Sequence, residues 1–185
     1  MTESTDEELV LKALAGSEVA AADIFRRYWT STWRVAVGIL GNRAAADDVA
    51  QDAMQRAFQA LGQFDTTRPL GPWLHRIVVN CALDLLRSER RLALSESRET
   101  PDLKVDAGES SLPDDDLFRA LRQLPPDRRA IVVLRYWLGY SAPEISDLLE
   151  IPVGTVSSRL SRALGDLRME LETNHGTRGD RRATA

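Results

Sequence analysis

The sequence predicts an all-α protein made of two small helical domains that are joined by a flexible acidic linker. Apolar residues recur at steps of three and four along most of the chain, which is the period of an amphipathic helix. Long alternating runs of Val, Ile and Thr, which are typical of strands, do not occur. Residues 95–113 show no sustained period and hold Pro, Gly, Ser and many acids, so we expect them to separate the domains.

The first domain, residues 1–94, is expected to contain four helices, at about residues 6–15, 17–40, 43–61 and 71–91. Asp6 and Ser17 have the residue type and position of N-caps for the first two helices. Residues 62–70 hold Gly, Asp, Thr and Pro, which is typical of a loop.

The second domain is expected to span residues 114–173. Three consecutive acids, from Asp114 on, suit the N-terminus of its first helix. Pro125 and Pro126 end that helix, and Asp127 is expected to cap the next. Residues 174–185 are polar, and we expect a disordered tail there.

Residues 141–171 predict a helix-turn-helix. Ser141 and Glu144 have the spacing of a capping box, and Pro152 suits the start of a second helix after a very short turn. Apolar residues of the second helix recur at steps of three and four and are expected to face a core: Val153, Val156, Leu160, Leu164, Leu167 and Leu171.

The opposite face of this helix carries Thr155, Ser158, Arg159 and Arg162. Hydroxyl and guanidinium groups on one helix face can bind phosphates and base edges in a major groove. The alternative is a helical hairpin with a solvated polar face. The short turn, which forces a steep crossing, and the scarcity of Glu and Lys on this face favour DNA binding.

One face of the helix expected at 71–91 is suited to single-stranded DNA. It combines an aromatic ring, an amide and arginines, which stack on bases, bind base edges and follow phosphates; its members are Trp73, Arg76, Asn80, Asp84 and Arg87. Trp73 can equally be a core aromatic at a helix start. His75 has no metal-ligating neighbours in the sequence, and Cys81 is expected to be an unreactive core thiol.

An acidic stripe lies on the helix expected at 43–61, where Asp48 and Asp52 are four residues apart with Gln51 beside them. Two carboxylates on one face could form a metal site or an acid–base pair. Since no histidine accompanies them, a protein-docking stripe or a plain solvated face is favoured over catalysis.

Composition narrows the class of protein. Apolar residues make up 43% of the 185 residues, which permits a real core. The net charge is −4, but its acidity lies in the middle of the chain, in residues 95–116, and mildly positive segments flank it on both sides. A single cysteine excludes an internal disulfide, and no run is long enough to span a bilayer. The acidic N-terminus is unlike a signal peptide, so we expect a cytoplasmic protein without membrane insertion.

Four motifs resemble those of bacterial extracytoplasmic-function (ECF) sigma factors of the sigma-70 family. They occur in the family's order and read DDVAQDAM (47–54), PWLHRIVVNCALDLLR (72–87), LPPDRRA (124–130) and IPVGTVSSRLSRA (151–163). The similarity extends over nearly everything from about residue 20 to residue 171.

The resemblance implies a transcription initiation factor that is not an enzyme and has no catalytic residues, metal or cofactor. Its partners would be promoter DNA, an anti-sigma factor and core RNA polymerase, through the beta-prime clamp helices and the beta flap. The clamp helices would be bound by Asp48, Gln51 and Asp52. Unpaired bases of the -10 element would be captured by Asp65, Arg68, Trp73, Arg76, Asn80 and Arg87. The -35 duplex would be read by Thr155, Ser157, Ser158, Arg159 and Arg162.

Three positions depart from the family pattern. Ser157 stands where the family often has Lys, Glu150 where it often has Gly, and Ser146 where it often has Ala. The first two changes predict weak intrinsic affinity for the -35 element, because one removes a phosphate contact and the other adds a negative charge.

Two other functions remain open at this point. The chain could be an autonomous helix-turn-helix regulator that acts as a dimer, although no heptad seam is evident. More remotely, it could be an interaction module or a hydrolase that uses Asp48 and Asp52.

Overall fold

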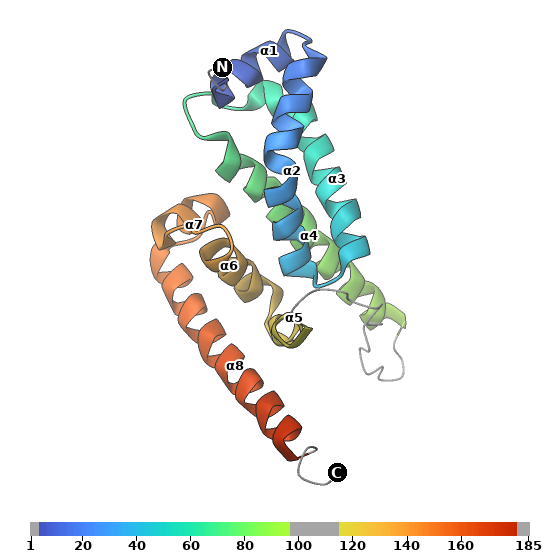
Figure 1. Cartoon of the computed structure of the whole chain (residues 1–185), viewed down its shortest axis with the longest axis vertical. Helices are drawn as coiled ribbons and strands as arrows, with labels where there is room; N and C mark the ends of the chain where they lie inside the picture. Colours follow the sequence, from blue (N-terminus) through green and yellow to red (C-terminus); the bar gives the residue numbers. More distant parts are fainter. Residues whose placement is uncertain (1–3, 97–114, 181–185) are drawn as a thin grey trace.

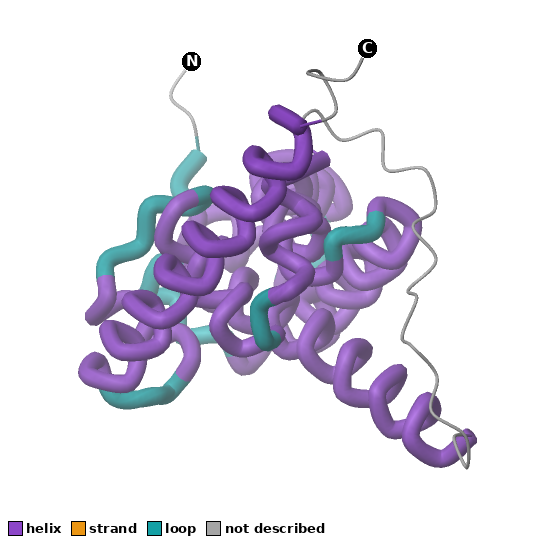
Figure 2. The backbone as a smooth tube through the Cα atoms, turned by 90° about the horizontal axis from the view of Figure 1, so that it is seen from below, coloured by secondary structure: helices purple, strands orange, loops and turns teal. Residues whose placement is uncertain are grey.

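The computed structural model describes residues 4–96 and 115–180, and every regular element in these ranges is a helix (Figures 1 and 2). The elements, in order, are α1 (Asp6–Leu14), α2 (Glu18–Leu40), α3 (Arg43–Ala60), the 3-10 turn η1 (Leu61–Gln63), α4 (Leu70–Glu96), α5 (Asp115–Gln123), α6 (Pro126–Tyr136), α7 (Ala142–Leu149) and α8 (Val153–Asp180). The predicted all-α class is confirmed. We call α1–α4 the N-terminal half and α5–α8 the C-terminal half.

Two of the predicted helix caps are present. The Ser17 hydroxyl accepts a hydrogen bond from the Ala20 amide at 3.3 Å. At the start of α7, Ser141 and Glu144 form the expected capping box, in which the Ser141 amide donates to the Glu144 carboxylate at 2.7 Å. Both caps satisfy amides that would otherwise lack partners at a helix N-terminus.

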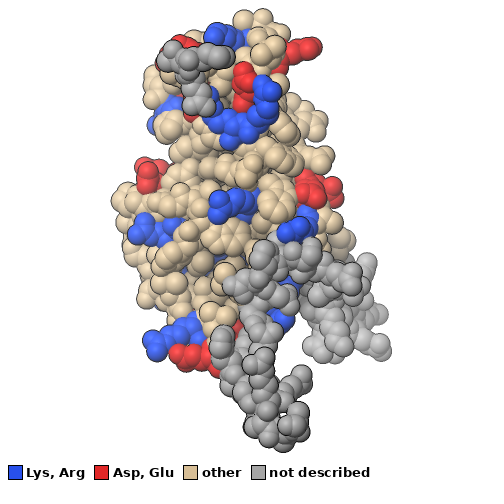
Figure 3. Space-filling view, in the orientation of Figure 1, with Lys and Arg blue, Asp and Glu red and all other residues tan. Residues whose placement is uncertain are grey.

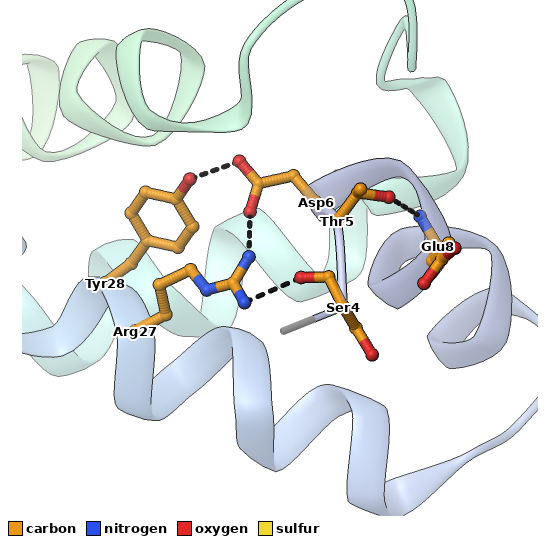
Figure 4. A network of polar contacts seen from close by, with 6 residues as sticks. All are labelled: Ser4, Thr5, Asp6, Glu8, Arg27 and Tyr28. Atoms are coloured by element: carbon orange, nitrogen blue, oxygen red, sulfur yellow. Dashed lines mark hydrogen bonds and ion pairs between the residues drawn. The ribbon is translucent and has the colours of Figure 1, made fainter. Parts of the chain in front are cut away.

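The prediction that Asp6 caps α1 is wrong, because Thr5 occupies the cap and its hydroxyl accepts from the Glu8 amide at 3.2 Å. Asp6 instead lies in the first turn and reaches α2, where its carboxylate accepts from Arg27 at 2.6 Å and from the Tyr28 hydroxyl (Figure 4). The side chain therefore fastens α1 to α2.

Helix α6 begins two residues earlier than the sequence predicts. Pro125 is its N-cap residue and Pro126 its first residue, so Asp127 lies in the first turn and is not the cap. Proline is favoured at a first helical position because its missing amide hydrogen is not needed there.

Two helices extend further than predicted. Helix α4 continues past residue 91 to Glu96, and α8 continues to Asp180, so residues 174–180 are helical where a disordered tail was expected. Most of the predicted linker, and residues 181–185, lie outside the described residues.

The core runs through both halves of the molecule. One buried cluster joins α1–α4 around Ile24, Met54 and Leu70, and another joins α5, α6 and α8 around Leu121 and Ala163. The largest cluster contains residues of α2, α3 and α4 together with residues of α6, α7 and α8. The C-terminal half therefore packs directly against the N-terminal half, alongside α2 and α4 (Figure 1).

The inward face of α8 differs in part from the prediction. Val156 and Leu167 are buried as expected, but Val153 and Leu164 are 43% and 40% exposed, and Ala163 is buried instead. Residues 156, 160, 163 and 167 form a continuous helical stripe, whereas residue 164 lies about 100° further round the helix. The small Ala163 side chain is in the cluster shared with α5 and α6.

Candidate nucleic-acid and polymerase-binding surfaces

The turn between α7 and α8 is fixed by its own hydrogen bonds. Glu150 ends α7 in the left-handed conformation, with φ 54° and ψ 43°. The Ile151 amide donates to the Ser146 carbonyl at 3.1 Å, and the Ser146 hydroxyl donates to the Ile151 carbonyl at 2.6 Å. Ser146, where the family often has Ala, thus gives the turn an additional hydrogen bond.

The face predicted to read DNA lies on the first turns of α8. Ser157, Ser158 and Arg162 are exposed, and Thr155 is half-buried. The Ser158 hydroxyl donates to the Thr155 carbonyl at 3.1 Å. Arg159 is half-buried, and its guanidinium lies 3.8 Å from the Asp127 carboxylate of α6. The five predicted residues therefore share one helix segment, and Arg159 is already partnered by an acid.

The second predicted DNA face lies on α4. Asn80 and Arg87 are exposed, while Arg76 is half-buried. Arg87 forms an ion pair with Asp84 at 2.9 Å, one turn away on the same helix. These side chains occupy neighbouring positions on a single helix face, as predicted.

Trp73 packs as a core aromatic would, and part of its ring remains accessible. It is partly buried in the apolar cluster of the N-terminal half, and its ring packs against Phe64 with centroids 5.0 Å apart. The remaining surface of the indole stays accessible at the start of α4. Packing against Phe64 fixes the ring and lowers the entropy that it would lose on stacking with a base.

The loop before α4 is ordered by Asp65. Its carboxylate accepts from the amide and hydroxyl of Thr67, at 3.0 and 2.7 Å, and lies 3.6 Å from Arg68. The hydrogen bonds from Thr67 lower the pKa of Asp65, so the carboxylate stays ionised. Asp65 and Arg68 are both exposed next to the start of α4.

The acidic stripe of α3 lies in the open. Asp48 and Gln51 are exposed, and the Asp52 carboxylate pairs with Arg56 at 2.8 Å. Asp47, one position before the stripe, accepts a hydrogen bond from the Trp33 indole at 2.6 Å. Within residues 4–96 and 115–180, no three His, Cys, Asp or Glu side chains are grouped as a metal site would require.

His75 is a buried residue that joins the two halves. Its ring nitrogens lie 2.7 Å from the Tyr140 hydroxyl and 3.0 Å from the Ser31 hydroxyl. Burial lowers the pKa of His75 to about 4. Cys81 is also buried, as predicted, and burial raises the pKa of its thiol.

Two residues at the contact between the halves, Glu150 and Arg129, were not assigned to a site from the sequence. The Arg76 guanidinium pairs with Glu150 at 2.7 Å, and Arg129 is a buried guanidinium. The last turn of α2 has no basic residue that could interact with its C-terminal carbonyls, so the sequence indicates that a cation from elsewhere can serve them. The sequence does not indicate which distant arginine does so.

Charge is dispersed over the face of the molecule seen in Figure 3. Arginines and acids alternate across a largely uncharged surface and do not gather in one continuous basic patch. Charges dispersed in this way supply little long-range attraction for DNA on this face. Among the described residues, no helix is both long enough and apolar enough to cross a membrane.

The structure thus combines a helix-turn-helix that has an exposed hydroxyl and guanidinium face with a helical unit that has a second face rich in arginine. Residues 11–92 match the family described as Sigma-70 region 2, and residues 114–167 match Sigma-70, region 4.

Known proteins support the same assignment. The chain is 31% identical over 180 residues to the ECF RNA polymerase sigma factor SigW of Bacillus subtilis, with 84% of this chain and 91% of that one covered. It is 35% identical over 163 residues to the ECF sigma factor SigM of Mycobacterium tuberculosis, covering 87% and 82%. The chain belongs to the ECF sigma factors of the sigma-70 family, which direct transcription initiation and are not themselves catalytic.

The fold is also similar to solved structures. A structure of CnrH in complex with the cytosolic domain of CnrY superposes with a TM-score of 0.69 at 28% identity, covering 91% of this chain and 97% of that one. The sigma factor RpoE of Bartonella quintana, solved with the anti-sigma factor NepR, shares the fold with a TM-score of 0.68 at 23% identity. The family matches and the relatives confirm the resemblance that the sequence motifs indicated.

Proposed function

We propose that this sigma factor reads the -35 duplex with the first turns of α8 and captures melted -10 bases with α4 and the loop before it. The observation that carries the proposal is the exposed Ser157, Ser158 and Arg162 face, which directly follows a turn fixed by hydrogen bonds. A short rigid turn presents the N-terminal residues of a recognition helix to base edges in the major groove.

The -10 surface is proposed from side-chain chemistry. The Trp73 ring, held by Phe64, offers a stacking surface, and the exposed Asn80 amide can bind the edge of an unpaired base. Arg76 and Arg87 lie along the same face, where phosphates would follow, and Asp65 and Arg68 border it from the loop.

Core polymerase is proposed to bind α3. Asp48, Gln51 and Asp52 present a short polar stripe that would meet a complementary basic surface on the beta-prime clamp helices. The C-terminal half would contact the beta flap, and the chain would work in the cytoplasm. An anti-sigma partner is proposed from the similarity to CnrH, which was solved in complex with a domain of CnrY.

Promoter selection with reconstituted polymerase tests this function. The chain and core polymerase are incubated with a random promoter library, and the initiating templates are sequenced. We expect two recurrent sequence blocks at a constant spacing, and initiation that requires both proteins. A dimeric regulator would bind specific DNA tightly without polymerase and would support no initiation at any template. That result would reject the promoter-reading roles proposed for α8 and α4.

A further inference from the structure

Helix α1 packs against the segment that leads into the proposed -10 surface. Leu9 and Val10 of α1 are buried in one apolar cluster. The same cluster contains Phe64, just before the loop, and Leu70, the first residue of α4. Helix α1 also contacts η1. The loop between Phe64 and Leu70 is therefore anchored at both of its ends by a cluster that α1 helps to bury.

The stacking ring of the proposed -10 surface depends on the same cluster. Trp73 packs against Phe64 with ring centroids 5.0 Å apart, and both rings belong to the cluster that contains Leu9. A displacement of α1 would leave Phe64 without part of its packing. Because protein interiors are close-packed, Trp73 would then lose its fixed orientation.

A polar contact at the start of α1 fastens this helix to α2. The Asp6 carboxylate accepts hydrogen bonds from Arg27 at 2.6 Å and from the Tyr28 hydroxyl (Figure 4). Arg27 also donates to the Ser4 carbonyl at 2.8 Å. Burial and the hydrogen bond to Asp6 raise the pKa of Tyr28, so its hydroxyl remains a donor at neutral pH. A helix of nine residues is marginal by itself, so these contacts hold α1 in place.

The Tyr28 ring connects this network to the first turn of α4. A Cβ added at Gly71 would lie 3.3 Å from Cε1 of Tyr28, so the ring rests against the helix backbone there. Gly71 is buried and lies two residues before Trp73. Asp6 therefore orients Tyr28, and Tyr28 in turn supports the backbone from which Trp73 projects.

Asp6 and Tyr28 are themselves unsuited to contact DNA. Both are half-buried, and the Tyr28 hydroxyl is occupied by Asp6. A carboxylate also repels the phosphates of a DNA strand. An effect of these two residues on base binding must therefore pass through the loop and the start of α4.

We propose that α1 is a positioning element of the -10 site, in which Asp6 and Tyr28 raise the affinity for unpaired -10 bases by fixing the start of α4 and the loop before it. The inference rests on the proposed function, since it needs bases to bind at Trp73 and Asn80. Binding is stronger when the protein side of a site already has its bound geometry, because less conformational freedom is lost. Asp6 and Tyr28 are positioning residues, whereas Trp73 and Asn80 would touch the bases.

Binding of a labelled single strand by the complete initiating complex tests this role. The chain is assembled with core polymerase, and affinity is measured for an oligonucleotide that carries the selected -10 block and for one with a single base of that block replaced. Tyr28→Phe removes the hydrogen bond and keeps the ring, and Asp6→Asn removes the charge that binds Arg27. Asp23→Asn is the control, because it removes an exposed ion pair with Arg26 on α2.

We expect Tyr28→Phe and Asp6→Asn to weaken binding of the selected strand and to reduce discrimination against the replaced base. A fall of the correctly positioned fraction to about one fifth predicts a loss of about fivefold. Asp23→Asn should bind as the wild-type chain does. Affinities for core polymerase and for a duplex that carries the -35 block should stay unchanged in all three variants. Equal losses in those two affinities would show a general structural role and would overturn the positioning role.

A double-variant cycle distinguishes positioning from an independent contact. If Tyr28 acts by placing Trp73, Tyr28→Phe should cost less strand affinity in a Trp73→Ala chain than in the wild-type chain. Losses that simply multiply would overturn the positioning role, because they would show that Tyr28 does not act through Trp73.

The outcomes separate this inference from the proposed function. Wild-type affinity and discrimination in both Tyr28→Phe and Asp6→Asn overturn the positioning role, and the -10 surface still stands if Trp73→Ala or Asn80→Ala weakens strand binding. Equal binding of the two strands by the wild-type complex, with no effect of Trp73→Ala or Asn80→Ala, overturns the proposed -10 surface itself.

Discussion

His75 is buried with a complete set of hydrogen bonds in its neutral form. The Ser31 hydroxyl donates to the Tyr28 carbonyl at 3.0 Å, so it accepts from the Nε2 hydrogen of His75. The Nδ1 atom then accepts from the Tyr140 hydroxyl. A second ring proton would disturb this arrangement in a buried site, and burial lowers the pKa of His75 to about 4.

We expect His75 to make the protein less stable in mild acid. Between pH 6.5 and about 4 the unfolded chain binds a proton at His75 that the folded protein does not bind. As the pH is lowered through this range, the free energy of unfolding therefore decreases by up to about 3 kcal/mol. Urea denaturation from pH 7.5 to 4.5 measures this slope. His75→Gln should flatten this slope, and an unchanged slope in His75→Gln would assign the effect to other groups.

Arg129 supports three backbone carbonyls from a buried position. Its guanidinium donates to Ile39, to Arg122 at 2.7 Å and to Leu124 at 3.0 Å. Burial lowers its pKa to about 10, so the group remains charged at neutral pH.

Replacing Arg129 should cost far more stability than replacing its neighbour. Arg129→Met leaves buried carbonyls unsatisfied, and we expect a loss of about 3 kcal/mol in the free energy of unfolding. Arg128→Met removes a half-exposed ion pair with Asp166 and should cost about 1 kcal/mol or less. Equal losses in chemical denaturation would show that the carbonyls do not depend on Arg129.

Helix α3 is the element to which we assign polymerase docking. Asp48→Ala/Asp52→Ala removes both carboxylates of the exposed stripe and should weaken binding to core polymerase by about tenfold or more. Glu8→Ala on the exposed side of α1 is the matched control. Unchanged affinity of the double variant, measured by fluorescence anisotropy with labelled chain, would remove the docking role from α3.

Helices α8 and α4 are expected to act at different promoter elements. Arg159→Ala should cost about 1–3 kcal/mol at the -35 element and relax specificity there, if the freed guanidinium reads a base. Asn80→Ala should impair strand opening and leave -35 binding intact. On one template, footprinting measures binding to the -35 element and permanganate reactivity measures strand opening. Loss of the -35 footprint in Asn80→Ala would refute the assignment of separate promoter elements to α4 and α8.

Features that depend only on residues close together in the sequence could be predicted. The helical period places Val156 and Leu167 on the buried face of α8, and the spacing of Ser141 and Glu144 predicts their capping box. The Asp6 prediction failed because Thr5 and Asp6 are both good caps, and the choice depends on Arg27 and Tyr28 of another helix. The extension of α8 was missed because its polar end lacks an apolar period.

At the scale of the whole molecule, the two halves share a core that their separate sequences do not reveal. The Arg76–Glu150 pair joins residues far apart in the chain, and neither residue's local pattern indicates the other. The helical patterns indicate two proposed reading surfaces, but they do not reveal that the two halves pack together. In this packing Glu150 contacts Arg76 of α4, a role that its place at the turn did not suggest.

Both proposed reading surfaces belong to one chain, so we expect their action at a promoter to depend on the geometry between the two elements. Changing the spacing by five base pairs rotates one element by about half a turn of the duplex relative to the other. A protein that contacts only one element is insensitive to such a rotation.

Run-off transcription with core polymerase on selected promoters that carry five additional base pairs between the two blocks tests the central claim most directly. We expect initiation to fall by at least about tenfold, and a full ten-pair insertion not to restore it, since the distance has then grown by about 34 Å. Initiation that is undiminished by the five-pair insertion would contradict the claim that one sigma factor reads both elements together.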